Sequence, residues 1–139
     1  LGTPFTSRPL TVSFDYTYQP GDSNEDANGQ PLSYGDQCDI YFLLENRADG
    51  QVKRVGTAWF RSGEAVSDWS SEIIPIKYGP LEASDPWFDY AQPRDDEVWG
   101  DGSEPITHVT FLATSSFEGD FFKGAIGSTL ELDEIELGY

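Results

Sequence analysis

The sequence predicts an all-β protein, an antiparallel two-sheet β-sandwich that forms a single domain over residues 1–139. Three observations support this prediction. Apolar and polar side chains alternate with a period of two along several segments, as in strands with one buried face. Glycine, proline, asparagine and aspartate cluster between these segments, where they favour turns. No stretch keeps an apolar period of 3.6 residues over three turns, so little helix is expected.

The clearest predicted strand covers residues 9–18. Its alternating apolar side chains are Leu10, Val12, Phe14, Tyr16 and Tyr18. Residues 38–46 form the second strand, with one face made by Cys38, Ile40, Phe42 and Leu44. Tyr41 and Leu43 make the other face of this strand partly apolar as well. The only cysteine, Cys38, is therefore expected to be a buried and inert thiol.

Four further strands are predicted at residues 52–60, 69–78, 106–114 and 129–137. Pro75 cannot donate a backbone hydrogen bond, so its strand is expected to lie at a sheet edge or to carry a bulge. In the last strand the apolar positions change phase between Leu132 and Ile135. That slip predicts a β-bulge near Asp133 and Glu134.

The segment from Pro80 to Pro105 is about 25 residues long, which is unusual for a plain connection in a compact domain. Two interpretations stay open for it. It is either a functional loop, or it carries short strands of its own.

The charge of the chain is strongly acidic. Against 25 acidic residues stand 8 basic ones, which gives a formal net charge of −17. A surface of this charge repels phosphate backbones and anionic lipids, so nucleic acids and membrane surfaces are poor partners. Cations and neutral ligands remain as candidates.

The chain lacks features of a membrane protein and of a complete precursor. No apolar run approaches the roughly 18–20 residues that span a bilayer, so no transmembrane segment is expected. Methionine is absent, and the chain opens without the charged and apolar regions of a signal peptide. We therefore expect a processed piece of a longer protein, with other domains of the same parent chain among its partners.

One carboxylate pattern near the end of the chain permits catalysis. Glycoside hydrolysis needs two carboxylates across one bond. Glu131, Asp133 and Glu136 could line one face of the last strand, because a bulge brings the third back into phase with the first two. They could then act as nucleophile, orienting group and acid. The competing interpretation, which we favour, is an ordinary solvent-facing strand in an acid-rich protein, with no catalytic residues.

Neither a metal site nor a nucleophilic catalytic triad has much support in the sequence. One cysteine and one histidine cannot form a zinc cluster, and His108 lies within a predicted strand, where a packed or half-exposed side chain is expected. Hard oxygen ligands for a structural calcium ion are offered by Asp22, Asn24, Asp26 and Asn28, although a flexible solvated loop fits this stretch better. Asp133 is a second candidate calcium ligand. No other cofactor is expected.

Aromatic side chains exceed what a core of this size needs. Flat rings recognise the apolar faces of sugars, while carboxylates and amides bond the hydroxyls. The candidate ligand-binding residues in the long loop are Trp87, Asp89, Tyr90, Asp95, Asp96 and Trp99, and those on the sandwich are Trp59 and Trp69. The alternative is that these rings clamp the loop onto the sandwich.

The closing segment FEGDFFKGAIGSTLELDEIELGY resembles the putative carbohydrate metabolism domain of Bacteroides-type cell-envelope proteins. That family ends in a phrase of the kind G-D-Y-F-x-G-A-x-G-S-T-L-x-V-D-D-x-x-L. The matching residues are Gly119, Asp120, Phe122, Gly124, Ala125, Gly127, Ser128, Thr129, Leu130, Asp133 and Leu137. The upstream GTPF and Cys-Asp-Ile-Tyr segments fit as well. Glu134 departs from the second aspartate of the phrase, which weakens the expectation of a calcium site made by two aspartates.

The resemblance implies a jelly-roll sandwich similar to carbohydrate-binding modules and galactose-binding-like folds, with the last strand running beside the first. It also implies the C-terminal domain of a secreted protein or surface lipoprotein, at the cell surface or in the periplasm of a Gram-negative bacterium. The leading expectation is a non-catalytic module that binds a polysaccharide or glycan. The alternatives are a glycoside hydrolase that uses Glu131 and Glu136, and an adhesin-like interaction domain without glycan binding.

Overall fold

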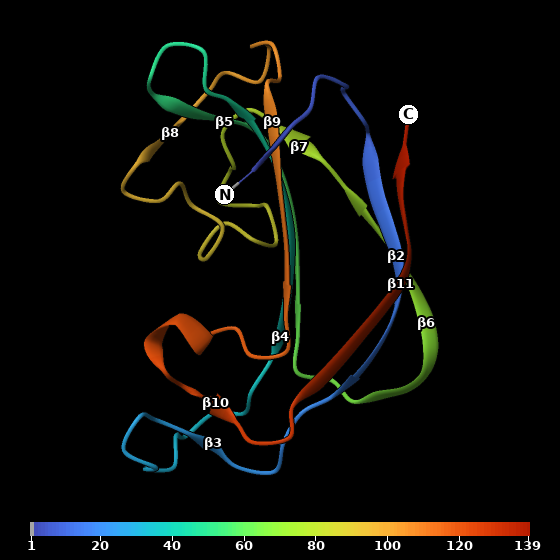
Figure 1. Cartoon of the computed structure of the whole chain (residues 1–139), viewed down its shortest axis with the longest axis vertical. Coiled ribbons are helices and arrows are strands. Elements are labelled where there is room, and N and C mark those ends of the chain that lie inside the picture. The colour runs from blue at the N-terminus through green and yellow to red at the C-terminus, as the bar shows by residue number, and fades with distance from the viewer. Residues whose placement is uncertain (1) are drawn as a thin grey trace.

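The computed structural model describes residues 2–139 and is built almost entirely of β-strands (Figure 1). The strands are β1 (Thr3–Pro4), β2 (Thr11–Gln19), β3 (Asn24–Glu25), β4 (Cys38–Asn46), β5 (Val52–Ser62), β6 (Val66–Pro75), β7 (Lys77–Tyr78), β8 (Glu97–Trp99), β9 (His108–Thr114), β10 (Gly124–Ala125) and β11 (Thr129–Gly138). Between residues 2 and 139 the helical content is one short 3₁₀ turn, η1 (Gly119–Phe121). None of the described residues forms a helix with the length and hydrophobicity of a membrane span.

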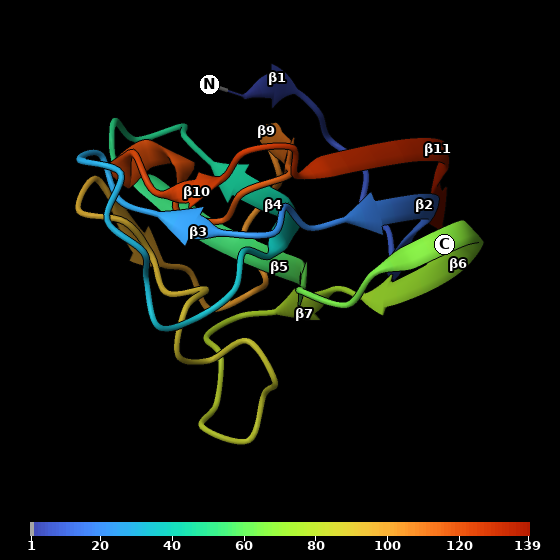
Figure 2. The same cartoon turned by 90° about the horizontal axis from the view of Figure 1, so that it is seen from below.

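Two sheets pack face to face, so the predicted all-β sandwich is confirmed. The larger sheet has six strands in the order β1-β9-β4-β5-β7, with β8 also paired to β5, and the smaller sheet has the order β11-β2-β6. Every pair in these sheets is antiparallel except β5 with β8. A separate two-stranded sheet, β10-β3, lies at one end of the molecule (Figures 1 and 2).

The main core lies between the two sheets. The alternation of β2 directs its apolar side chains inward, as predicted, where they meet one face of β4. The core includes Val12, Phe14, Tyr16, Tyr18, Cys38, Ile40, Phe42 and Leu44. The thiol of Cys38 is fully buried among them, in agreement with the prediction for the only cysteine. Burial of this apolar surface stabilises the sandwich.

A second, smaller core covers the outer face of the larger sheet. Tyr41, Leu43 and Trp59 lie on this face and pack against Leu81 and Ala91 of the long segment between β7 and β9. All of β4 is therefore buried, on both faces. This explains why its sequence is apolar at consecutive positions, as in strands that are covered on both sides. The long segment also carries β8, so it has a short strand of its own.

The predicted strand 69–78 is interrupted in the structure. It ends as β6 at Pro75, and the chain resumes as β7 in the other sheet. The linking residue Ile76 donates its backbone N–H to the carbonyl of Leu10 at 2.8 Å. Pro75 cannot continue a ladder that needs its N–H, and β6 is an edge strand, as its proline predicted.

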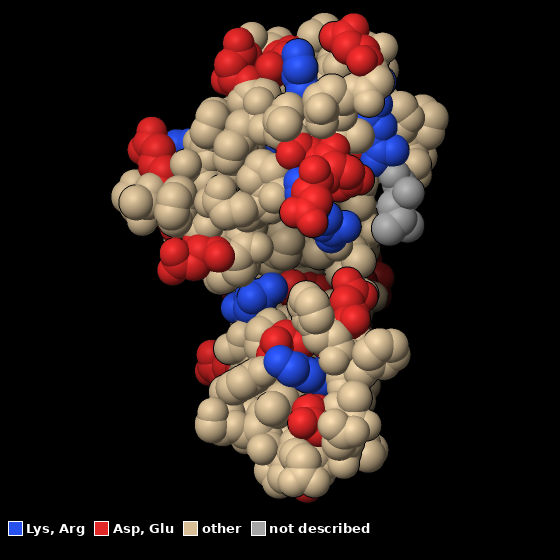
Figure 3. All heavy atoms as spheres, turned by 90° about the vertical axis from the view of Figure 1, so that its left-hand side faces the viewer, with Lys and Arg blue, Asp and Glu red and all other residues tan. Residues whose placement is uncertain are grey.

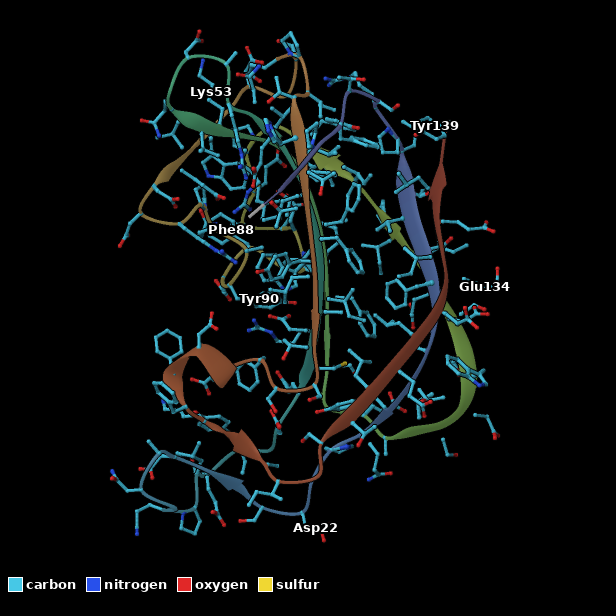
Figure 4. The ribbon with its side chains drawn as sticks, in the orientation of Figure 1. Asp22, Lys53, Phe88, Tyr90, Glu134 and Tyr139 are labelled. Atoms are coloured by element: carbon cyan, nitrogen blue, oxygen red, sulfur yellow. The ribbon has the colours of Figure 1, made fainter. Side chains whose placement is uncertain are left out.

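The closing strand β11 pairs with β2 along almost its whole length, as the resemblance implied. The register shifts between Asp133 and Glu136, which confirms the predicted bulge. Glu134 sits in this bulge with a positive φ of 49°. Figure 4 shows Glu134 where the ribbon of β11 bends at the surface.

Candidate functional site

A cleft of about 340 Å³ opens on the outer face of the larger sheet. It lies between the long segment that precedes β9 and the turn that contains η1. Its lining includes the aromatic residues Tyr41, Trp59, Tyr90 and Phe117 and the charged residues Asp39, Arg61, Arg94 and Asp120. Figure 3 looks onto this side of the molecule, which is indented between a larger upper part and a smaller lower part.

The floor of the cleft is made by neighbouring rows of the sheet. Tyr41 on β4 pairs with Trp59 on β5 and with Leu112 on β9. Because paired residues of antiparallel strands project from the same face, these three side chains form one row. The rings of Tyr41 and Trp59 are 4.2 Å apart between centroids. The floor is thus made largely of packed aromatic side chains on three neighbouring strands, in which Tyr41 and Trp59 are 5% and 6% exposed.

Asp39 and Arg61 form the adjacent row, paired across β4 and β5. The carboxylate of Asp39 accepts hydrogen bonds from Nε1 of Trp59 at 2.5 Å and from Nε and Nη2 of Arg61 at 3.0 and 2.7 Å. Asp39 is only 4% exposed, so its charge is compensated by these bonds and not by water. The contacts fix the orientation of the Trp59 ring.

The long segment supplies one wall of the cleft through Tyr90. A turn closed by hydrogen bonds from the N–H groups of Tyr90 and Ala91 to the carbonyl of Trp87 presents this ring. Tyr90 meets Trp59 edge to face at 6.0 Å, and the guanidinium of Arg61 lies 4.2 Å from its ring centre. Burial raises the pKa of the Tyr90 hydroxyl, so it is a neutral hydrogen-bonding group at ordinary pH. Figure 4 shows Tyr90 and Phe88 on this part of the chain.

The opposite wall is the segment around η1. The Arg61 guanidinium lies 4.7 Å from the centre of the Phe117 ring, so it contacts the faces of two aromatic rings, Tyr90 and Phe117. Glu118 accepts hydrogen bonds from the Tyr34 hydroxyl and from Nζ of Lys123. These contacts fasten the rim of the cleft to the loop that follows β3.

A buried carboxylate anchors the lower part of the molecule from inside. Asp36 is 3% exposed and accepts hydrogen bonds from the hydroxyls of Ser116 and Ser128, at 2.6 and 2.7 Å, and from the N–H of Ala125 at 3.0 Å. Ser128 also accepts the N–H of Gly21 at 3.0 Å. The segment that carries η1 is thereby fixed at both of its ends.

The predicted tryptophans lie in different environments. Trp59 lines the cleft. Trp69 lies on β6 in the smaller sheet and is 54% exposed. Trp87 and Trp99 pack against the cores and do not line the cleft. These two side chains therefore clamp the long segment onto the sheet, which is the alternative that the sequence left open.

The predicted polar partners of the loop are surface groups. Asp89, Asp95 and Asp96 are all exposed. Asp96 lines a second cavity of about 200 Å³ on the same face of the sheet, and none of the three lines the cleft itself. Tyr90 is the one residue of the predicted loop set that the structure brings to the cleft.

The acidic residues of the closing strand lie on the other side of the molecule. Glu131, Asp133 and Glu136 are exposed and share the outward face of the smaller sheet, as their spacing predicted. Glu131 accepts a hydrogen bond from the hydroxyl of Thr17 at 3.2 Å. None of the three acids lines the cleft.

The candidate calcium loop is closed by its own hydrogen bonds. Asn24 is buried and its amide donates to the carbonyl of Tyr34 at 3.1 Å. Asp26 accepts the N–H groups of Asn28 and Gln30 at 2.8 and 3.0 Å, while Asp22 is exposed at the end of the molecule (Figure 4). From residue 2 to residue 139, no group of three or more His, Cys, Asp or Glu side chains is arranged to hold a metal ion.

Six of the aromatic and charged residues named in the cleft lining were not predicted: Asp39, Tyr41, Arg61, Arg94, Phe117 and Asp120. The sequence signal that could have revealed Asp39 lies in the strand 38–46. Asp39 is a charged residue on the strand face that also carries the apolar Tyr41 and Leu43. A polar residue that alternates into a covered face is a candidate for a buried hydrogen-bonded pair. Its partner could not be identified, because the sequence does not give the register between β4 and β5.

Fold and site together define the class: a two-sheet β-sandwich with an aromatic and hydrogen-bonding cleft on its larger sheet. The chain belongs to the family described as the putative carbohydrate metabolism domain, whose sequence profile matches residues 1–138. The resemblance noted from the closing segment is therefore confirmed, and the domain is related to carbohydrate metabolism. No curated protein matches the chain.

Two solved structures are similar to the whole chain. One, described as a putative glycoside hydrolase from Bacteroides thetaiotaomicron VPI-5482, is 26% identical with a TM-score of 0.72 over 100% of this chain. The other, described as a putative glycoside hydrolase from Bacteroides vulgatus ATCC 8482, is 24% identical with a TM-score of 0.71 over 99% of this chain, and it supports the fold alone. This chain spans 40% of the first protein and 55% of the second.

Proposed function

We propose that this domain is a non-catalytic carbohydrate-binding module whose site is the cleft between Tyr90 and η1. The observation that supports it most is the floor formed by Tyr41 and Trp59, walled by Tyr90 and flanked by fixed charged groups. Stacking on the apolar face of a pyranose and hydrogen bonding to its hydroxyls need this combination of groups. In the parent protein the domain would hold a glycan close to the other domains, outside the cytoplasm.

The carboxylates of the cleft favour binding over catalysis. Hydrolysis of a glycosidic bond uses one carboxyl group as an acid and a second as nucleophile or base. Asp39 and Asp120 are the carboxylates in the lining, and Asp39 already accepts hydrogen bonds from Trp59 and Arg61. The oxygens of Asp39 are thus occupied inside the sheet, which leaves Asp120 as the one carboxylate of the lining that is exposed to a ligand, one fewer than hydrolysis requires.

A panel of neutral and acidic polysaccharides tests the proposal, with intrinsic tryptophan fluorescence as the readout. We expect saturable binding to at least one glycan, because Trp59 forms the floor. Tyr90→Ala should weaken that binding roughly 10-fold or more, given about 0.5–1.5 kcal/mol for an aromatic contact beyond its buried area. Trp69→Ala is the matched control, since it removes an exposed aromatic ring from the other sheet. Glycan binding that is lost in Trp69→Ala and kept in Tyr90→Ala would contradict the site.

The hydrolase alternative is tested with the same glycans. The two similar structures are described as putative glycoside hydrolases, and the exposed Glu131 and Glu136 share one face of β11. If these acids are catalytic, reducing sugar should appear with the unmodified domain and disappear with Glu131→Gln. Binding without release of reducing sugar, unchanged by Glu131→Gln, is the result that the proposal expects.

A further inference from the structure

We infer that the glycan taken by the cleft carries an isolated acidic group, a carboxylate or a sulfate, which Arg94 recognises. This inference rests on the proposed function, because it names the class of glycan for the same cleft. It depends on how the two arginines of the cleft are used by the protein itself.

Arg61 is fully used by the fold. It forms an ion pair with Asp39 through two of its nitrogens, and its guanidinium lies against the rings of Tyr90 and Phe117. Arg61 therefore positions the aromatic walls and has its counter-charge already.

Arg94 is in a different situation. Its guanidinium donates to the hydroxyl of Tyr41 and lies 5.4 Å from the ring centre of the same residue. Glu97 and Asp120 interact with its charge at longer range, but among residues 2–139 no carboxylate lies close enough to form an ion pair with it. A guanidinium has five N–H donors in a planar fork that matches a carboxylate or sulfate, and only one hydrogen bond to a side chain uses them here.

The position of Arg94 also fits a ligand contact. It lines the cleft together with Tyr41 and Tyr90, and it lines the neighbouring cavity as well. Its side chain is exposed, so the free donors can reach a ligand without rearrangement of the core. A sugar ring that is stacked on the floor of the cleft would place one of its substituents against Arg94.

The net charge limits the kind of acidic glycan. A protein of charge −17 repels a densely charged polyanion at long range. At physiological ionic strength this repulsion is screened beyond about 8 Å, whereas a direct contact with Arg94 is not. The ligand that fits is therefore a sugar chain with separate acidic groups, such as single uronate residues or single sulfate esters.

The test compares matched ligands on the purified domain. Oligogalacturonate is titrated against its methyl ester, which keeps the sugar chain and removes the charge, and a sulfated galactan oligosaccharide without uronate forms a third arm. We expect an acidic ligand to bind roughly 10-fold or more tightly than the methyl ester, as for a hydrogen bond between charged groups. Tighter binding of the oligogalacturonate identifies a carboxylate, and tighter binding of the sulfated galactan identifies a sulfate.

Arg94→Gln should abolish the preference for the acidic ligand. Lys53→Gln is the control, since it makes the same change in net charge at a residue that lines neither cavity. Figure 4 shows Lys53 above Phe88 and Tyr90, and this variant should keep the preference. Urea unfolding of both variants shows whether each is folded. The inference would be overturned if Arg94→Gln kept the preference for the acidic ligand. It would also be overturned if the unmodified domain bound acid and ester equally and Tyr90→Ala weakened the binding of both. Either result would leave the proposed function standing. Failure of every glycan to bind would overturn both.

Discussion

Asp39 and Trp59 are joined by a hydrogen bond of 2.5 Å from the indole Nε1 to the carboxylate, across the neighbouring strands β4 and β5. Both side chains are almost completely buried, and Arg61 neutralises the carboxylate. The aromatic floor of the cleft is thus oriented by a buried ion pair. Stability of the large sheet and geometry of the cleft therefore depend on the same residue.

Asp39→Asn should destabilise the domain and disorder the floor of the cleft. The change leaves Arg61 without its counter-charge inside the protein, which costs about 2–4 kcal/mol of unfolding free energy. Urea denaturation measures it. Asp68→Asn, on the exposed part of β6, is the control and should change the unfolding free energy by less than about 0.5 kcal/mol. Equal effects of the two variants would show that the Asp39 contacts contribute little.

Glu134→Gly should preserve or raise stability, because Glu134 has a positive φ of 49° that glycine adopts without strain. We expect a change between zero and about 1 kcal/mol in favour of the folded state. Glu136→Gly removes the same charge from the same exposed strand, outside the left-handed region, and should destabilise by about 1 kcal/mol. Thermal unfolding compares the pair. The account of the bulge is wrong if both substitutions destabilise equally.

Asp36→Ala should loosen the lower part of the molecule. The substitution removes the acceptor shared by Ser116, Ala125 and Ser128 inside the protein, so we expect a loss of about 2–4 kcal/mol. Hydrogen exchange should show the largest increase at the amide of Ala125, with smaller changes in the center of β4. Uniform acceleration over the whole domain would instead indicate a global effect.

Cys38 gives a specific dependence of stability on pH. Burial raises the pKa of its thiol from about 9 to about 11. The folded state therefore disfavours the thiolate, and the stabilising contribution that is present below pH 9 is lost as the pH rises through 11. As the pH rises from 9 to 11, the unfolding free energy of the unmodified domain should fall by up to about 2–3 kcal/mol more than that of Cys38→Ala, which has no thiol to titrate. Parallel pH profiles of the two proteins would contradict the buried thiol.

The long strands were predictable because their side chains alternate over many residues. The two-residue strands β1, β3 and β10 are too short to show a period, and they form only because the surrounding chain places them side by side. The break at Pro75 was signalled by the proline, but the switch to the other sheet depends on where Tyr78 can pack. Local sequence does not contain that information.

The site was predictable only in part. Trp59 and Tyr90 were candidates because the chain carries more aromatic residues than a core of its size needs, and the structure places both in the lining of the cleft. Trp87 and Trp99 were candidates for the same reason, but their rings pack against the cores, because the burial of each ring depends on the path of the loop. Asp39 and Arg61 are 22 positions apart, and only the register of β4 against β5 brings them together.

The central claim is that a glycan binds in the cleft of the larger sheet, and the indole N–H signals of the four tryptophans test it most directly. Each signal is assigned from a single Trp→Phe variant in a two-dimensional nitrogen–proton spectrum. During titration with a bound glycan, we expect the Trp59 signal to shift while the Trp69 signal stays in place. A shift of Trp69 with no change at Trp59 would place the ligand on the opposite sheet and contradict the account.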